Sequence, residues 1–135
     1  MNDPGCYQLL IHLEKERRIG IGKLGRFYFP AGWYIYTGSA LGGMTQRISR
    51  HLRKEKRLHW HIDYLLQYAQ VKGVKKCLTT RRKECSLSVQ LFKRYKAEII
   101  VKKFGSSDCR CDTHLAYFEE KPDIPNFKRS FECRN

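Results

Sequence analysis

The sequence predicts a single mixed domain of the α/β class, α+β type, from three observations. The chain has 135 residues, a length that suits one domain burying roughly two thirds of its extended surface. Residues 33–37 form an aromatic strand in which Tyr34 and Tyr36 project to the same face. Residues 41–54 then carry apolar side chains at spacings of three and four, which is the period of an amphipathic helix.

Further β-structure is predicted ahead of the aromatic strand. Residues 7–13 are rich in leucine and isoleucine and predict a first strand, which is followed by a polar turn at 14–18. Residues 19–29 predict a hairpin with its turn at 23–25. The first third of the chain is therefore expected to consist of strands.

The helix predicted at 41–54 has two distinct stripes. The apolar stripe, which we expect to face the core, consists of Leu41, Met44, Ile48 and Leu52. The neighbouring stripe, which we expect to be partly exposed and open to a ligand, consists of Arg47, His51 and Lys54. Arg47 and His51 lie one helical turn apart, close to the end of the aromatic strand. With the strand tyrosines they make a set that can hold a phosphate and move a proton.

The second half of the chain alternates helices and strands. We predict helices at 60–69 and 81–95 and strands at 71–78, 98–103 and 115–118. Glu84 falls in the first turn of the second of these helices, where the helix dipole favours a carboxylate. Residues 121–135 contain two prolines and no apolar period, which predicts a loosely docked tail after a domain at 1–120.

The charge of the chain favours a nucleic-acid partner. There are 27 lysines and arginines against 13 acidic residues, for a formal net charge of +14. Such a surplus is typical of proteins that neutralise phosphates and release counterions. Two other interpretations stay open, namely a surface tuned for solubility and attraction to an anionic membrane surface. Charge alone does not separate DNA from RNA.

Targeting features and cysteines bear on the compartment. No apolar run approaches the ~20 residues of a membrane-spanning helix, and the first residues lack the basic and then apolar pattern of a signal peptide. We therefore expect a soluble, cytoplasmic protein with no membrane partner. Its six cysteines are then expected to be reduced, with some buried and some available to a metal.

Five short features resemble the GIY-YIG nuclease superfamily. In chain order they are Gly5-Cys6-Tyr7, Tyr36-Thr37-Gly38, Arg47, His51 and Glu84. The segments FPAGWYIYTGSALGG, RISRHLRKEKRLHWHIDYLL and FGSSDCRCDTHLAYF are similar to one branch of that superfamily, which occurs alone or fused to endonuclease III-type DNA glycosylases. The resemblance covers about residues 5–118.

The resemblance implies both a fold and an activity. The fold is a small, mostly antiparallel central sheet flanked by about three helices, to which this chain adds an N-terminal hairpin. The activity is that of a divalent-metal-dependent endonuclease hydrolysing nucleic-acid phosphodiester bonds, in DNA repair or processing. DNA is favoured over RNA as the partner, and a DNA-repair protein such as a glycosylase is a further expected partner.

The resemblance also implies roles for individual residues. Glu84 would hold one Mg²⁺ or Mn²⁺ ion, since carboxylate oxygens suit these cations. Tyr7 would activate the attacking water with help from Tyr36, although an unperturbed tyrosine is a poor base at neutral pH. Arg47 would offset charge on the scissile phosphate, and His51 would contact phosphate or relay a proton. The residues expected to contact the nucleic acid are Ser39, Arg50, Arg53, Lys54 and Ser107.

One departure from the superfamily leaves a first alternative open. The asparagine common late in GIY-YIG nucleases has no obvious counterpart, because Asn2, Asn126 and Asn135 lie near the chain ends. A non-catalytic nucleic-acid-binding module with a degenerate site is therefore an alternative function.

Cysteines and histidines near residue 110 support a second alternative. Cys109, Cys111 and His114 are potential zinc ligands, with His59 and His61 as distant candidates for the remaining positions. A zinc-stabilised protein-interaction domain would follow from such a site. The other interpretation is that the cysteines only pack in the protein and that the histidines bind phosphate or structural partners.

Overall fold

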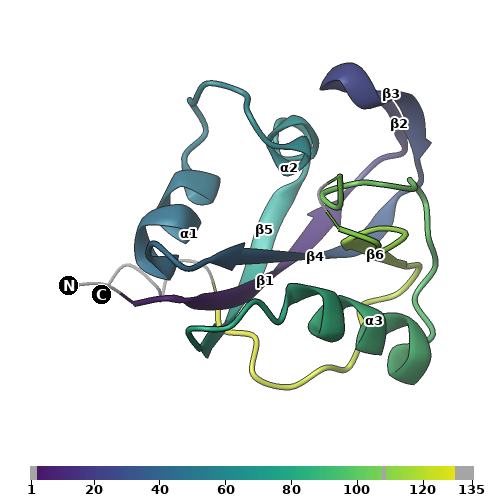
Figure 1. The fold of residues 1–135 in the computed structure, drawn as a ribbon. Coiled ribbons are helices and arrows are strands. Elements are labelled where there is room, and N and C mark those ends of the chain that lie inside the picture. Colours follow the sequence, from purple (N-terminus) through teal and green to yellow (C-terminus); the bar gives the residue numbers. More distant parts are fainter. Residues whose placement is uncertain (1–2, 108, 130–135) are drawn as a thin grey trace.

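A four-stranded antiparallel sheet, in the order β5-β1-β4-β6, forms the centre of the fold (Figure 1). The computed structural model describes residues 3–107 and 109–129. The strands are β1 at Gly5–Leu13, β4 at Gly32–Ala40, β5 at Gln70–Leu78 and β6 at Leu115–Phe118. The predicted α+β class, with a small antiparallel sheet, is confirmed.

The predicted N-terminal hairpin forms a separate two-stranded sheet. β2 at Arg17–Ile21 pairs with β3 at Gly25–Phe29 through a 3₁₀ turn at Gly22–Leu24. Gly22 and Gly25 have φ values of 51° and 128°, which glycine adopts without steric cost. The turn therefore depends on glycines at both of its ends.

Three helices flank the sheet, and each is shorter than its predicted range. They are α1 at Met44–Leu52, α2 at His61–Leu65 and α3 at Glu84–Tyr95. The start of α1 is delayed because Gly43 has a φ of 140°, which lies outside helical geometry. Asp3 then accepts a hydrogen bond of 3.1 Å from the backbone N–H of Thr45, in the first turn of α1.

The strand predicted at 98–103 is wrong. Only Glu98 pairs with the sheet, through an isolated bridge to Tyr117 in β6. The chain then turns away and carries Val101 and Phe104 into the core on the opposite face from α3. Burial of these two side chains therefore prevails over continued strand pairing.

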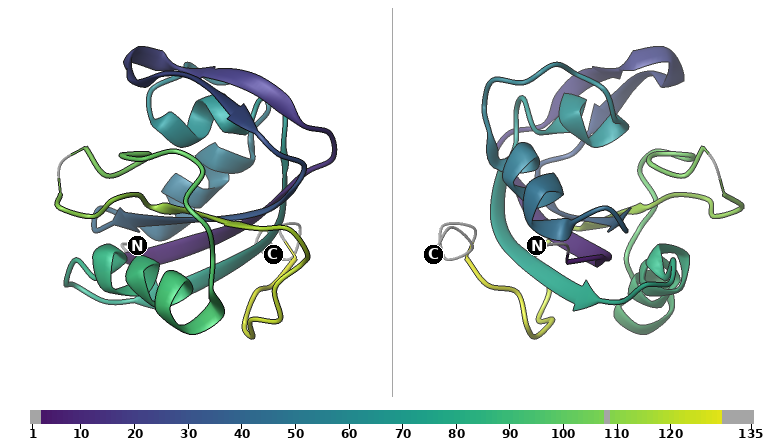
Figure 2. Two further views of the ribbon diagram at one scale, coloured as in Figure 1. Left: turned by 90° about the vertical axis from the view of Figure 1, so that its right-hand side faces the viewer. Right: turned by 60° about the vertical axis from the view of Figure 1, so that its left-hand side comes forward.

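The two faces of the sheet have separate cores (Figure 2). One face is covered by α1, α2 and the hairpin. Its core is the larger of the two, and the inner strands β1 and β4 contribute to it Tyr7, Leu9, Ile11, Leu13, Tyr34 and Tyr36. The other face is covered by α3, and its smaller cluster consists of Leu10, Ile35, Leu91, Ala116 and Phe118. Because successive side chains of β1 and β4 point to opposite faces of the sheet, both strands contribute to both cores.

Part of the stripe assignment on α1 needs correction. Met44 and Ile48 are buried as predicted, and Leu52 is half-buried. Leu41 lies before the helix begins and is 36% exposed. His51, expected on a partly exposed stripe, is only 3% exposed, because its ring points into the core beside Tyr7.

The segment after β6 returns to the sheet. Ile124 and Phe127 pack against the smaller core, and Lys128 and Val74 exchange backbone hydrogen bonds of 2.7 and 2.9 Å. The division into a domain at 1–120 and a tail at 121–135 stays a prediction. Within the described part of the chain, no helix combines the length and apolar character that a membrane crossing requires.

Candidate functional site

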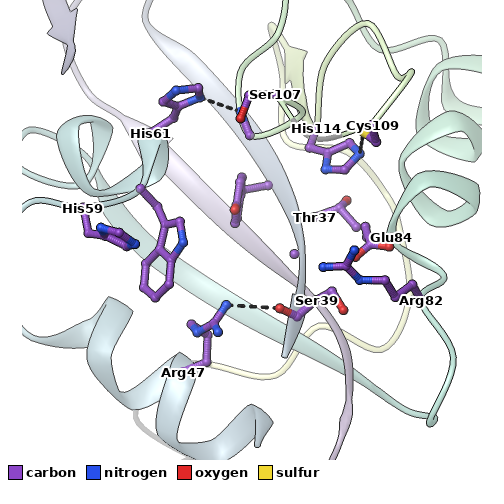
Figure 3. Close-up of a pocket in the computed structure, with 14 residues that line it drawn as sticks. Thr37, Ser39, Arg47, His59, His61, Arg82, Glu84, Ser107, Cys109 and His114 are labelled. Carbon is purple, nitrogen blue, oxygen red and sulfur yellow. Dashed lines mark hydrogen bonds between the residues drawn. The ribbon is translucent and has the colours of Figure 1, made fainter. Parts of the chain in front are cut away.

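A polar cavity of about 480 Å³ opens where β4 ends between α1 and the start of α3 (Figure 3). Five of the residues predicted for catalysis or nucleic-acid contact line it, and they are Tyr36, Ser39, Arg47, Glu84 and Ser107. They come from β4, α1, α3 and the loop before β6, so the fold brings together residues that are distant in sequence. The cavity also borders Cys109 and His114.

Arg47 is held at one wall of this cavity. Its Nη1 donates a hydrogen bond of 3.1 Å to the Ser39 backbone carbonyl, drawn as a dashed line in Figure 3. Its guanidinium also lies over the Trp60 ring, 4.3 Å from the ring centroid, which is a cation–π contact. Arg47 also interacts with Tyr7, and a guanidinium carries five N–H donors in a planar fork that suits carboxylates and phosphates.

Tyr7 and His51 form a buried pair outside the set of side chains that line the cavity. The Tyr7 hydroxyl lies 2.7 Å from His51 Nε2, and the two residues are 1% and 3% exposed. Tyr7 lies opposite Gly38 in the β1–β4 ladder, and a Cβ on Gly38 would lie 2.6 Å from the Tyr7 ring. The glycine that ends Tyr36-Thr37-Gly38 therefore makes room for the tyrosine of the first motif.

The pKa values of this pair keep both groups neutral. Burial raises the pKa of Tyr7 well above 10, and the nearby Arg47 guanidinium offsets only part of that shift. Burial lowers the pKa of His51 to about 3, against an opposing attraction from Asp63. Tyr7 is therefore a phenol, and His51 is a neutral imidazole that is a weak base.

The remaining basic residues predicted to contact nucleic acid lie on α1 and just beyond it. Arg50 is largely engaged, because its Nη1 and Nη2 bind Asp63 at 2.9 and 3.0 Å. Arg53 and Lys54 are exposed. A shallow groove beside α1 is lined by Arg47, Arg50 and Arg53, so the basic surface continues from the cavity along the helix.

Glu84 sits in the first turn of α3, and Cys6 fixes the chain just before it. The Cys6 thiol sulfur accepts a hydrogen bond of 3.2 Å from the Lys83 backbone N–H. Glu84 is the one carboxylate among the described residues that line the cavity. Carboxylate oxygens are the ligand type that hard divalent cations prefer in proteins.

A group of metal-ligand side chains lies directly beside the cavity. The ligand atoms of Cys85, Cys109, Cys111 and His114 all lie within 4.8 Å of one another. His59 and His61 are not members of this group. Burial, followed by the neighbouring thiols, raises the pKa of Cys85. The donor set is soft and therefore suited to metals other than Mg²⁺ or Mn²⁺.

Comparison with known proteins gives a family for the chain. A family model described as "Domain of unknown function DUF123" matches residues 6–133. The chain belongs to the DUF123 family. No curated protein matches it, and no solved structure does.

Three residues of this DUF123 chain belong to the site region, although the sequence does not assign them to the cavity. His61 borders the cavity, and its Nδ1 accepts a hydrogen bond of 2.8 Å from the Gly105 backbone N–H. Arg82 lines the cavity beside Glu84. From the helical pattern, Cys85 is expected only to pack on the buried face of its helix. Its position directly after Glu84 is the one sequence feature that suggests a role at the site.

The buried His51 predicts an acid-sensitive fold for this DUF123 domain. The unfolded chain binds a proton at His51 near pH 6.5, whereas the folded chain binds it only near pH 3. The free energy of unfolding should therefore fall as the pH drops below 6.5, by up to about 1.4 kcal/mol per pH unit. Urea titrations between pH 7 and pH 4 measure this dependence.

His51→Gln should flatten that pH dependence, because it removes the titrating group. His59→Gln is the matched control, since His59 is exposed and should leave the slope unchanged. An identical slope in wild type and His51→Gln would show that other groups govern the acid sensitivity.

Proposed function

We propose that this DUF123 domain is a divalent-metal-dependent endonuclease that hydrolyses phosphodiester bonds, with DNA favoured over RNA, in repair or processing. One observation carries the proposal: Tyr36, Arg47 and Glu84 meet at one polar cavity from three different elements. The resemblance to GIY-YIG nucleases assigns the same three residues to one active site. The net charge of +14 supports an anionic polymer as substrate.

In this proposal Arg47 binds the scissile phosphate. Its guanidinium is held from two sides, by the Ser39 carbonyl and the Trp60 ring, so little side-chain entropy is lost on binding. A fixed cation at the cavity wall stabilises the charge that develops on the phosphate in the transition state. The exposed Arg53 and Lys54 extend this surface along the nucleic-acid backbone.

Glu84 is the residue of this cavity that would hold a catalytic Mg²⁺ or Mn²⁺ ion. When bound, such an ion supplies Lewis-acid stabilisation of the phosphate oxygens. Glu84 itself contributes a negative oxygen at the wall formed by the start of α3, opposite the wall that Arg47 forms (Figure 3). The carboxylate and the guanidinium thus enclose the position assigned to the phosphate.

The proton of the attacking water is assigned to the Tyr7–His51 pair. Tyr7 remains a phenol, so its hydroxyl can accept a proton from the water only if it gives up its own proton at the same time. His51 Nε2, 2.7 Å away, is the group placed to accept that proton, although burial lowers its pKa to about 3 and makes it a weak base. Arg47 interacts with Tyr7 as well as lining the cavity, which connects the phosphate position to the buried pair. Tyr36, at the cavity wall, orients the water.

Tyr7→Phe tests this assignment. It removes the hydroxyl and keeps the ring, so cleavage should fall by roughly 10²–10⁴-fold, as for loss of a general base. The affinity for uncleaved DNA should stay within about twofold, because Tyr7 does not line the cavity. Tyr28→Phe, at an exposed tyrosine of the hairpin, is the matched control. Full activity in Tyr7→Phe would remove Tyr7 from the mechanism.

A non-catalytic nucleic-acid-binding module is the second candidate function. The observation that favours it is the deep burial of Tyr7, which is 1% exposed, together with the missing late asparagine. Such a module binds DNA with a steep dependence on salt and releases no product with any metal.

A further inference from the structure

Three cysteines and one histidine lie at the junction between α3 and the loop that precedes β6. Cys85 is in the first turn of α3, and Cys109, Cys111 and His114 follow in the loop. His114 Nε2 lies 3.6 Å from Cys85 Sγ and 3.5 Å from Cys109 Sγ. All four ligand atoms lie within 4.8 Å of one another.

These spacings agree with a tetrahedral zinc site. With Zn–S near ~2.3 Å and Zn–N near ~2.1 Å, tetrahedral angles place sulfur and nitrogen roughly 3.6 Å apart. The two sulfur–nitrogen distances in the structure, 3.6 and 3.5 Å, agree with this separation within about 0.1 Å. The other separations are at most 4.8 Å, so shifts of about 1 Å or less close the side chains around an ion.

We propose that Cys85, Cys109, Cys111 and His114 bind one structural Zn²⁺ ion. Four protein ligands leave no open coordination position, which is the pattern of structural rather than catalytic zinc. The soft thiolates also separate this site from the carboxylate Glu84, which is suited to Mg²⁺ or Mn²⁺. The proposal stands independently of the nuclease assignment.

The ion would join two walls of the cavity. Glu84 precedes Cys85 directly, and Ser107 lies in the same loop as Cys109. That loop has little regular secondary structure, and it is anchored by backbone hydrogen bonds such as His114 N–H to Phe104 carbonyl at 2.8 Å. A zinc ion therefore supplies a cross-link where the sheet and helices do not.

Metal content is the first test. Wild-type protein purified without added chelator should contain about one zinc ion per chain by elemental analysis. Cys85→Ser and Cys111→Ser should each lose at least about tenfold in zinc affinity, since even substitutions in the outer shell of zinc sites cost roughly 10–100-fold. Cys77→Ser, at a cysteine of β5 outside the group, should keep its zinc.

Two further measurements keep the proposal open to refutation if a variant fails to fold. Cobalt added to chelated wild-type protein should give thiolate charge-transfer and tetrahedral d–d absorption bands, and chelation should lower the Tm. Glu84→Gln should retain full zinc content, which separates this site from the nuclease proposal. Three results would each overturn the zinc proposal. They are absence of zinc from the wild-type protein, no change in Tm on chelation, and a disulfide between these cysteines.

Discussion

Glu84→Gln should strongly reduce metal-dependent cleavage while leaving the fold intact. The substitution keeps the size of the side chain and removes the negative charge, and Glu84 is half-buried at the cavity wall. It is the one carboxylate among the described cavity residues, so no neighbour replaces it. We expect a loss of about 10²–10³-fold in the cleavage rate, as for removal of several kcal/mol of transition-state stabilisation.

The control for this prediction is Glu119→Gln, at an exposed carboxylate just after β6. It changes the net charge by the same amount without touching the cavity. Equal cleavage by wild type, Glu84→Gln and Glu119→Gln would contradict the role given to Glu84. Equal loss in both variants would point to a general effect of charge.

Asp63→Ala should strongly destabilise the fold. Asp63 is 0% exposed and accepts hydrogen bonds from the Arg50 guanidinium at 2.9 and 3.0 Å. Its Oδ2 also accepts the backbone N–H groups of His59 and Trp60, at 2.8 and 2.9 Å. Although burial opposes ionisation, these hydrogen bonds outweigh it and lower the pKa of Asp63.

Removing this carboxylate leaves two backbone N–H groups without their acceptor, and it leaves the Arg50 guanidinium with only the Arg57 carbonyl. We expect a loss of about 3–5 kcal/mol in the free energy of unfolding, measured by urea titration at neutral pH. The consequence extends to the cavity, because Asp63 holds the segment that places Trp60 beside Arg47. Asp123→Ala, at an exposed aspartate, is the control. A loss below about 1 kcal/mol would contradict a structural role for the buried carboxylate.

The sheet was predictable from the sequence because its strands have strong local patterns. The alternation of Tyr34 and Tyr36 and the hairpin at 19–29 both have the period of a half-buried strand, and both are confirmed. The segment at 98–103 is rich in β-branched residues, which also favour strands, but it forms no strand. Burial of Val101 and Phe104 determines the conformation of this segment, and such tertiary packing cannot be predicted from the local sequence pattern.

The residues of the cavity were predictable only in part. Tyr36, Arg47 and Glu84 came from motif resemblance, and the fold places all three at one cavity. Burial of His51 was not predictable, because the apolar stripe of α1 is broken by a polar ring that pairs with Tyr7. The sequence does not identify Cys85 as a metal ligand, because its partners lie more than twenty residues away and sequence spacing does not show which distant residues are close in space.

Cleavage of labelled DNA and RNA by the wild-type protein tests the central claim most directly. Single-stranded, duplex and branched substrates should each be incubated with Mg²⁺, with Mn²⁺ and with chelator, beside Glu84→Gln. The nuclease proposal predicts cleavage of at least one DNA substrate that requires the divalent ion and is lost in Glu84→Gln. Salt-sensitive binding without cleavage on any substrate, or cleavage unaffected by Glu84→Gln, would contradict it.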